Sequence, residues 1–289
     1  MISSVGRIEP WRQRNWDWRA AGNFIGGGSG SGLLLSVPFA GDAAAPRLTL
    51  LGLALIGAGL LCVWLEIGRP WRALNVYRRP ASSWMTREAL LAPLLFACGA
   101  AVVWRAGRTF ESLLAGLALA YVYCQARMLQ GGRGIPAWRH PRVVPLLVTT
   151  AIAEGFGLGL AVLAATAMGV IPASLPWLTA TALLARGAVL IVYRGALAGK
   201  APTLALAALD EHIVVDRLLT AAAMICLLAG ATIAGGRWLL VFGGLAALAA
   251  GSLLKYTIVV RASFNQGFAL PLLPVRGPGR AAPGARPGW

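Results

Sequence analysis

The sequence predicts an all-α, polytopic integral membrane protein with eight transmembrane helices. Hydrophobic residues make up 58% of the 289-residue chain, charged residues make up 12%, and the mean hydropathy is +0.70. Apolar runs of about twenty residues recur along the chain, and a helix needs a run of about that length to cross a hydrocarbon layer about 30 Å thick. An ordinary soluble domain is excluded, because its surface could not carry so many apolar runs.

Each expected helix is one of these apolar runs. The runs cover residues 20–40, 48–67, 88–104, 110–128, 145–168, 175–197, 218–235 and 238–260. The first contains the stretch GGGSGSG from Gly26, but no strand precedes this stretch and no phosphate-binding Lys-Ser/Thr follows it. We therefore interpret it as a run of small residues for close helix contact. Asn23, near the start of the same helix, can cap the helix, bridge helices or face a ligand, and we favour the structural roles.

Three regions follow from this pattern. Residues 1–19 mix arginines with tryptophans, which predicts an amphipathic segment with its aromatic rings at headgroup level. Residues 20–260 form the eight-helix transmembrane domain. Residues 261–289 become rich in Pro and Gly, and we expect a cytoplasmic tail that is flexible or that orders against a partner. No cleavable signal peptide is expected, because about twenty polar and aromatic residues precede the first apolar run.

The basic residues predict how the chain is oriented. The net charge is +16, but the 26 basic residues are dispersed between apolar runs and do not line one soluble face, so a nucleic-acid partner is not expected. Of these residues, 21 lie at the termini and in the loops after the second, fourth and sixth helices, and four lie in the opposite loops. Since basic loops stay in the cytoplasm, we expect a multi-pass protein of the cytoplasmic membrane with both termini in the cytoplasm.

The chain offers no residues for a redox cofactor of its own. The four cysteines stand alone in separate apolar runs, and the two histidines fall in expected cytoplasmic loops: Cys62, Cys98, Cys124, Cys226, His140 and His212. Cluster cysteines need short spacings, and bis-histidine haem needs paired histidines within helices. We therefore expect no metal site, no haem and no iron-sulfur cluster in this chain. If the protein carries electrons, they must arrive from another subunit and leave on a diffusible carrier, a quinone.

A polar hairpin between the second and third helices is the most informative stretch. From residue 65 to residue 88 it reads LEIGRPWRALNVYRRPASSWMTRE, with five arginines between Glu66 and Glu88. Both carboxylates are expected at one membrane face, at interface depth. Such a place suits proton-coupled chemistry on a lipid-soluble substrate. The alternative is an ordinary cytoplasmic loop whose charges only set orientation.

These residues also carry a resemblance to a known family. The runs EIGRPWRALN from Glu66 and SSWMTRE from Ser82 are similar to the loop between helices two and three of DmsC/NrfD-like membrane anchors of DMSO-reductase-type molybdopterin oxidoreductases. The runs WDWRAAGNF from Trp16 and GIPAW from Gly134 resemble the branch of sulfite dehydrogenase and phenylacetyl-CoA:acceptor oxidoreductase anchors. The likeness spans most of the chain. In one departure, the DMSO reductase anchor carries a histidine where Glu66 stands.

The resemblance implies a function and two partner subunits. The chain would anchor a molybdopterin catalytic subunit and a four-cluster iron-sulfur subunit, and would reduce menaquinone or ubiquinone. Glu88 matches the family's glutamate and is our first candidate for the proton-relay carboxylate, with Glu66 second. Further candidates to hold the headgroup or to dock the iron-sulfur subunit are Arg72, Trp84, Arg87 and Lys255. For Lys255 the alternative is snorkelling to the lipid headgroups.

Two charges fall deeper in the bilayer. Glu154 and Arg186 both lie near the middle of their helices, so we expect them to pair inside the bundle, as a structural pair or as part of a functional site. We expect an acidic cluster before residue 218 to be a solvated loop, with a proton antenna as the alternative: Asp210, Glu211, His212 and Asp216. The deep charges also keep open a secondary transporter, whose polar site lies at the midplane. A structural anchor without a quinone site is a third alternative.

Overall fold

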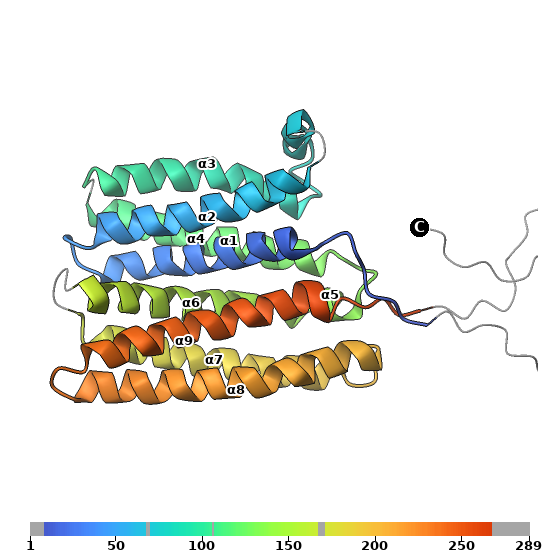
Figure 1. Ribbon diagram of the computed structural model, residues 1–289. Helices are drawn as coiled ribbons and strands as arrows, with labels where there is room; N and C mark the ends of the chain where they lie inside the picture. The colour runs from blue at the N-terminus through green and yellow to red at the C-terminus, as the bar shows by residue number, and fades with distance from the viewer. Residues whose placement is uncertain (1–8, 68–69, 106, 167–170, 268–289) are drawn as a thin grey trace, which may run out of the picture.

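The computed structural model describes residues 9–67, 70–105, 107–166 and 171–267, except for the side chains of residues 70–73. Within these ranges the long helices form one bundle (Figure 1). They are α1 (Trp18–Ser36), α2 (Ala45–Glu66), α3 (Trp84–Val103), α4 (Arg108–Gln130), α6 (Val143–Thr166), α7 (Ser174–Leu197), α8 (Thr203–Thr232) and α9 (Arg237–Tyr256). The short helices are η1 (Val37–Phe39), η2 (Pro70–Arg78), α5 (Pro136–Arg139) and the π-helical turn η3 (Thr257–Arg261).

Consecutive long helices run up and down, so the two ends of the bundle differ. One end carries the residues before α1, the helices η2 and α5, and the residues that follow η3 (Figure 1). We call it the terminal end, and we call the opposite one the far end. The connections that the sequence analysis assigned to the arginine-rich side all lie at the terminal end. The bundle therefore separates the two kinds of loop that the charge count distinguished.

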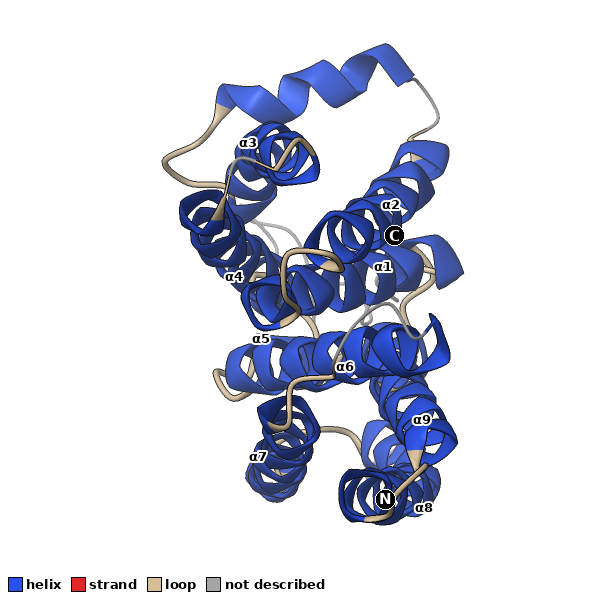
Figure 2. Cartoon of the chain, turned by 90° about the vertical axis from the view of Figure 1, so that its left-hand side faces the viewer, coloured by secondary structure: helices blue, strands red, loops and turns tan. Residues whose placement is uncertain are grey.

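The helices form two groups that meet at α1 and α6 (Figure 2). The first group contains α1 to α4, with α1 packed on α2 and α3 packed on α4. The second contains α6 to α9, with α9 packed on both α6 and α8. Contacts of α1 with α6 and α9, and of α4 with α6, join the groups. As a result α1 touches four other long helices and lies inside the bundle.

The chain is a polytopic membrane protein. Seven of the described helices, α2 to α4 and α6 to α9, are long and apolar enough to cross a membrane, judged by length and composition. The helix α1 has a lower mean hydropathy than these seven, because much of it is glycine and serine. Its enclosed position explains this composition, since an interior helix presents little surface to lipid and packs through small residues.

The glycines of α1 bring the backbones of its neighbours close. A Cβ atom on Gly26 would lie 2.6 Å from the carbonyl oxygen of Leu55 in α2, and one on Gly30 would lie 2.6 Å from that of Gly52. On another side of α1, a Cβ on Gly32 would overlap the carbonyl of Ala151 in α6. Any larger side chain at these positions would push α1 away from its neighbours. This arrangement confirms that the glycine stretch serves close helix packing.

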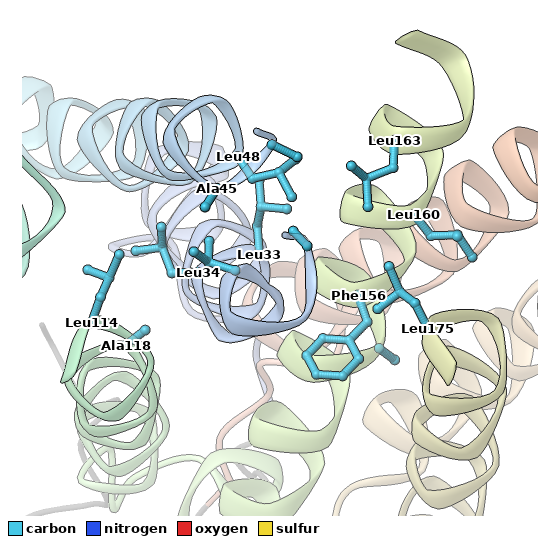
Figure 3. Packing of buried hydrophobic residues seen from close by; sticks show 14 of the residues in the cluster. Leu33, Leu34, Ala45, Leu48, Leu114, Ala118, Phe156, Leu160, Leu163 and Leu175 are labelled. Carbon is cyan, nitrogen blue, oxygen red and sulfur yellow. The ribbon is translucent and has the colours of Figure 1, made fainter. Parts of the chain in front are cut away.

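Two clusters of buried hydrophobic residues fill the bundle, one toward each end. The cluster toward the far end gathers around Leu33 and Leu34 of α1, where α2, α4, α6 and α7 converge (Figure 3). The cluster toward the terminal end contains Phe24 of α1 and residues of α4, α6, α7 and α9. Arg186 lies between Leu183 of the first cluster and Leu190 of the second. A layer containing buried charges therefore separates the two apolar clusters.

The two ends of the described chain pair with each other at the terminal end. Arg12 and Phe264 form an isolated antiparallel β-bridge, and the amide nitrogen of Asn265 donates to the carbonyl of Trp11 at 3.1 Å. Trp16 stacks on Trp138 of α5, with ring centroids 4.9 Å apart. Part of the expected amphipathic segment, residues 1–8, and most of the expected tail, residues 268–289, lie outside the described residues.

One expected boundary is wrong. The helix expected at residues 218–235 begins at Thr203, directly after Pro202. The acidic cluster that was expected in a solvated loop is therefore helical, and His212 and Asp216 are buried. Four buried residues of this segment, Ala205, Leu209, His212 and Asp216, recur at intervals of three or four and so share one helical face.

The packing of α1 predicts an unequal effect of two glycine substitutions. Gly30→Ala introduces a Cβ against the backbone of α2, so it should destabilise the folded protein by roughly 1–3 kcal/mol. Gly116→Ala in α4 is the control, because a Cβ there meets nothing within 4 Å. Thermal denaturation of the purified variants should give a lower melting temperature for Gly30→Ala alone. Equal melting temperatures would contradict the close packing of α1.

Candidate functional site

A cavity of about 510 Å³ opens at the terminal end of the bundle. Residues of α1, α2, η2, α3 and α4 line it, together with Trp16 and Ile67 beside these helices. Most of the lining is apolar or aromatic, and the polar exceptions are Asn23, Glu66 and Glu88. An apolar cavity with a few convergent polar groups is typical of a small-molecule site. The hairpin that the sequence analysis singled out therefore contributes both of its carboxylates to one cavity.

Glu88 lies one turn into α3 and is only 4% exposed. Ser83 caps this helix by accepting a hydrogen bond from the amide of Thr86, so the register that places Glu88 inward is set locally. The side-chain amide of Gln125 in α4 donates to Glu88 Oε1 at 3.0 Å and to the carbonyl of Asn23 at 3.1 Å. Gln125 thus joins α1, α3 and α4 around the carboxyl group.

Two polar groups beside Glu88 have free hydrogen-bonding capacity. The side chains of Asn23 and Tyr121 both neighbour the carboxyl group. In the part of the chain that the structure describes, Asn23 Oδ1 and the Tyr121 hydroxyl are buried without a hydrogen-bond partner. Buried polar groups are almost always satisfied. Asn23 also lines the cavity, so its free Oδ1 atom indicates a place for a ligand or water there, whereas Tyr121 does not line the cavity. The sequence analysis missed Tyr121 and Gln125, although their spacing of four places them on one face of a helix.

Glu66 lies at the other side of the cavity, at the last residue of α2, and is partly exposed. A nearby ion pair closes this part of the terminal end. Arg19 binds Asp17 through both Nε and Nη2 and donates to the carbonyl of Leu65 at 3.2 Å. These hydrogen bonds hold the pKa of Asp17, which precedes α1, below its usual value. The start of α1 is in this way tied to the end of α2.

Trp84 and Arg87 do not line the cavity. The guanidinium carbon of Arg87 lies 4.1 Å from the centroid of the Trp84 ring, and that of Arg127 lies 4.7 Å from it. Arg87 also donates to the carbonyls of Pro80 and Ala81, at 2.9 and 2.7 Å. These contacts fix the loop before α3 through cation-π and hydrogen bonds. The side chain of Arg72 lies outside the described part of the structure.

The deep charges pair differently from the expectation. Glu154 of α6 binds Lys255 of α9 and accepts a hydrogen bond from Ser29 of α1 at 2.9 Å. Arg186 of α7 binds Asp216 of α8. The prediction of a direct pair between Glu154 and Arg186 is therefore wrong. The extension of α8 brings a second carboxylate into the layer and α9 brings a second cation, so each charge finds another partner.

Lys255 is 1% exposed, so it neither lines the cavity nor snorkels to the headgroups. His212 adds an imidazole to the layer, with Nε2 at 3.7 Å from Asp216 Oδ1. We call the following residues the charged cluster: Glu154, Arg186, His212, Asp216 and Lys255. Among the described residues, no group of three or more His, Cys, Asp or Glu is arranged to hold a metal ion.

A comparison with protein families identifies the chain. The model of the DMSO reductase anchor subunit family, DmsC, matches residues 44–245. The chain belongs to this family. The matched region begins at the start of α2 and ends within α9 of this chain. It includes Glu66, Glu88 and Glu154. A search of curated proteins gives no match to the chain.

Membership makes the chain a membrane anchor of the DMSO reductase type, a subunit of an oxidoreductase complex. The catalytic and iron-sulfur subunits of such a complex are its implied partners. The matched region of this DMSO reductase anchor leaves out α1, and so leaves out Asn23 and Ser29. The group around Glu88 and the charged cluster thus both contain residues inside the family match, and both also contact a residue of α1.

The pairing in the charged cluster of this DMSO reductase anchor predicts which double variant recovers. Glu154→Gln or Lys255→Met alone leaves a buried charge without its partner, which should cost roughly 3–5 kcal/mol. The double variant leaves no charge and should recover most of the folded protein, measured as the amount extracted from membranes and its melting temperature.

Glu154→Gln combined with Arg186→Gln is the contrasting variant. This double variant leaves both Lys255 and Asp216 buried without a partner. It should therefore be at least as unstable as Glu154→Gln or Arg186→Gln alone. Recovery in this second double variant would instead support direct pairing of Glu154 with Arg186.

Proposed function

We propose that the chain is the quinone-reactive anchor of its complex and passes electrons from an iron-sulfur subunit to a membrane quinone in the cavity at the terminal end. The observation that carries this proposal is the buried carboxyl group of Glu88, which lines an apolar cavity together with Asn23, whose Oδ1 atom is unpartnered in the described residues. The family supports it, since anchors of this family bind menaquinone.

The cavity suits a quinone headgroup chemically. A quinone ring needs apolar walls and a hydrogen-bond donor for a carbonyl oxygen, and the quinol needs an acceptor for a hydroxyl group. Asn23 and Glu88 line the cavity. The protonated carboxyl group of Glu88 can donate, and the side chains of Asn23 and Glu88 can accept. Apolar residues of the wall, such as Phe24 and Met85, are suited to contact the ring.

Reduction of the quinone consumes two electrons and two protons, so the site needs a group that gives and regains protons. Glu88 can give its proton to the carbonyl oxygen that it contacts, while Gln125 holds the carboxyl group in place. Glu66, at the partly exposed side of the cavity, is the second candidate for this group. The electrons come from the partner's clusters when these are docked.

The terminal end is the proposed docking face. Arg78, Arg79 and Arg139 lie there, and Arg139 donates to Gln266 at 3.1 Å. With this end in the cytoplasm, the iron-sulfur and molybdopterin subunits would be cytoplasmic. The bundle would then cross the membrane eight times with both termini inside, α1 included.

The relationship of the chain to one branch of the family is also a proposal. The two runs that resemble the sulfite dehydrogenase and phenylacetyl-CoA:acceptor oxidoreductase anchors contact each other, because Trp16 of one stacks on Trp138 of the other. Trp138 also donates to the carbonyl of Ile258 at 2.7 Å. The resemblance of the two runs supports placing the chain in that branch, on the side of the second enzyme.

Family membership argues against the secondary transporter. The structural anchor without a quinone site remains an alternative that the following prediction separates from our proposal.

Glu88→Gln should slow quinone reduction without impairing assembly, because glutamine keeps the size of the side chain but cannot supply a proton. The purified complex is reduced with one equivalent of dithionite, and reoxidation of its iron-sulfur clusters by menadione is followed by stopped-flow absorbance. We expect the rate to fall roughly 100-fold. Reoxidation by ferricyanide, which takes electrons from the partner directly, should be unchanged.

Glu111→Gln is the matched control, since Glu111 is also a buried glutamate, 8% exposed, but lies at the far end. It should behave as the wild type with both oxidants. A wild-type rate for Glu88→Gln with menadione would favour the structural anchor.

The orientation predicts where fused reporters appear. Reporters placed after Trp289 and within residues 70–80 should be cytoplasmic, and one within residues 105–109 should be on the opposite side, because the arginine-rich loops stay inside. Protease protection in sealed vesicles measures this. A C-terminus outside the cytoplasm would overturn the proposed docking face.

A further inference from the structure

The charged cluster has no role in the function proposed so far. Its five residues come from α6, α7, α8 and α9, and each is at most 5% exposed. Apolar residues of similar volume often serve stability as well as a buried ion pair or better, so stability alone does not account for buried charges. Within a membrane, such residues by default mark paths for ions, protons or substrates.

The cluster is continuous across the second group of helices. His212 Nε2 lies 3.7 Å from Asp216, and Asp216 binds Arg186. Arg186 also donates to the carbonyl of Ala250 in α9 at 3.1 Å, five residues before Lys255. Lys255 binds Glu154, which reaches Ser29 of α1. The polar groups thus extend from α8 on the outside of the bundle to α1 at its centre.

Consecutive glycines of α1 bring this cluster next to the quinone cavity. A Cβ on Gly28 would collide with the ammonium group of Lys255, and a Cβ on Gly27 would collide with the amide of Gln125. Gln125 is the residue that donates to Glu88. The charged cluster and the polar group around Glu88 therefore contact the same turn of α1 from two sides. At this turn α1 has no side chains to separate them.

Three atoms of the cluster are buried without a hydrogen-bond partner in the described ranges: Glu154 Oε1, Arg186 Nε and His212 Nε2. Such atoms in proteins are usually satisfied by internal water, which also carries protons between side chains. Two hydroxyl groups also contact the cluster, Ser29 from α1 and Thr220 from α8.

We propose that the charged cluster is a proton relay that takes up protons at His212 and delivers them through Lys255 to Glu88. After Glu88 gives its proton to the quinone, the Lys255 ammonium group returns one to the Glu88 carboxylate past Gly27 and Gly28. The Lys255 amine regains a proton from the His212 imidazolium by way of water and the carboxylates. The imidazole is protonated again from the aqueous phase.

One passage moves one proton, and two passages supply one quinone. The inference rests on the proposed function, because it assigns the source of the protons that Glu88 transfers.

The test uses the complete complex in proteoliposomes and follows reoxidation of its dithionite-reduced clusters by menadione from acidic to alkaline pH. His212→Gln removes the titrating group and strands no charge. This variant should slow reoxidation by menadione roughly 100-fold. In the wild type the rate should fall as the pH rises and the imidazole loses its proton, and in the variant this pH dependence should be absent. Reoxidation by ferricyanide should not change.

Asp210→Asn is the matched control, because Asp210 lies on the same helix but is exposed and paired with Arg194. It should keep the wild-type rate and pH profile. Gly28→Ala is the second variant, since its Cβ displaces the Lys255 ammonium group while every titrating group is kept. It should also slow reoxidation by menadione, with Gly116→Ala as its control.

A wild-type rate and pH profile for assembled His212→Gln overturns the relay, and so does a wild-type rate for Gly28→Ala. Glu88→Gln, measured alongside, separates this failure from that of the proposed function. If only Glu88→Gln is slow, the quinone site stands and the relay fails. If Glu88→Gln is also unimpaired, the proposed function itself fails.

Discussion

Close backbone packing around α1 is the constraint on which the rest of the structure depends. In a bilayer, helices gain little from hydrophobic association and are held by van der Waals contact and hydrogen bonds. The small residues of α1 permit this contact on several sides at once, with α2 at Gly26 and Gly30 and with α6 at Gly32. Because α1 is enclosed in this way, it can carry the polar residues Asn23 and Ser29 without exposing them to lipid.

The same helix separates two polar systems of different character. Beside α1 and α4, Glu88 lines a cavity that opens toward the terminal end, and the polar atoms around it are only partly satisfied. Beside α6 and α9, Glu154 and Lys255 are paired within the layer between the two apolar clusters. The first system lines a cavity that a small molecule can enter, whereas the residues of the charged cluster are each at most 5% exposed. This difference is why we assign substrate chemistry to Glu88 and proton transfer to the charged cluster.

Much of the fold, and part of the site, followed from local patterns. Runs of apolar residues near the thickness of a bilayer predicted the long helices, and the hairpin predicted that Glu66 and Glu88 lie at one end. The start of α8 was missed because the charged residues Asp210 and Glu211 interrupt its apolar run, although His212 and Asp216 share a helical face with Leu209. Length and polarity alone do not distinguish a solvated loop from a helix that buries one polar stripe.

By itself, the sequence determined the class of the protein, the end at which the arginines gather and the family to which the chain belongs. These properties depend on residues close together in the chain. Only the tertiary structure decided that Glu154 binds Lys255 and Arg186 binds Asp216, that Gln125 orients Glu88, and that Trp84 and Arg87 lie outside the cavity. Which helices become neighbours depends on how small residues interlock across the bundle, and a buried charge takes the partner that this packing presents.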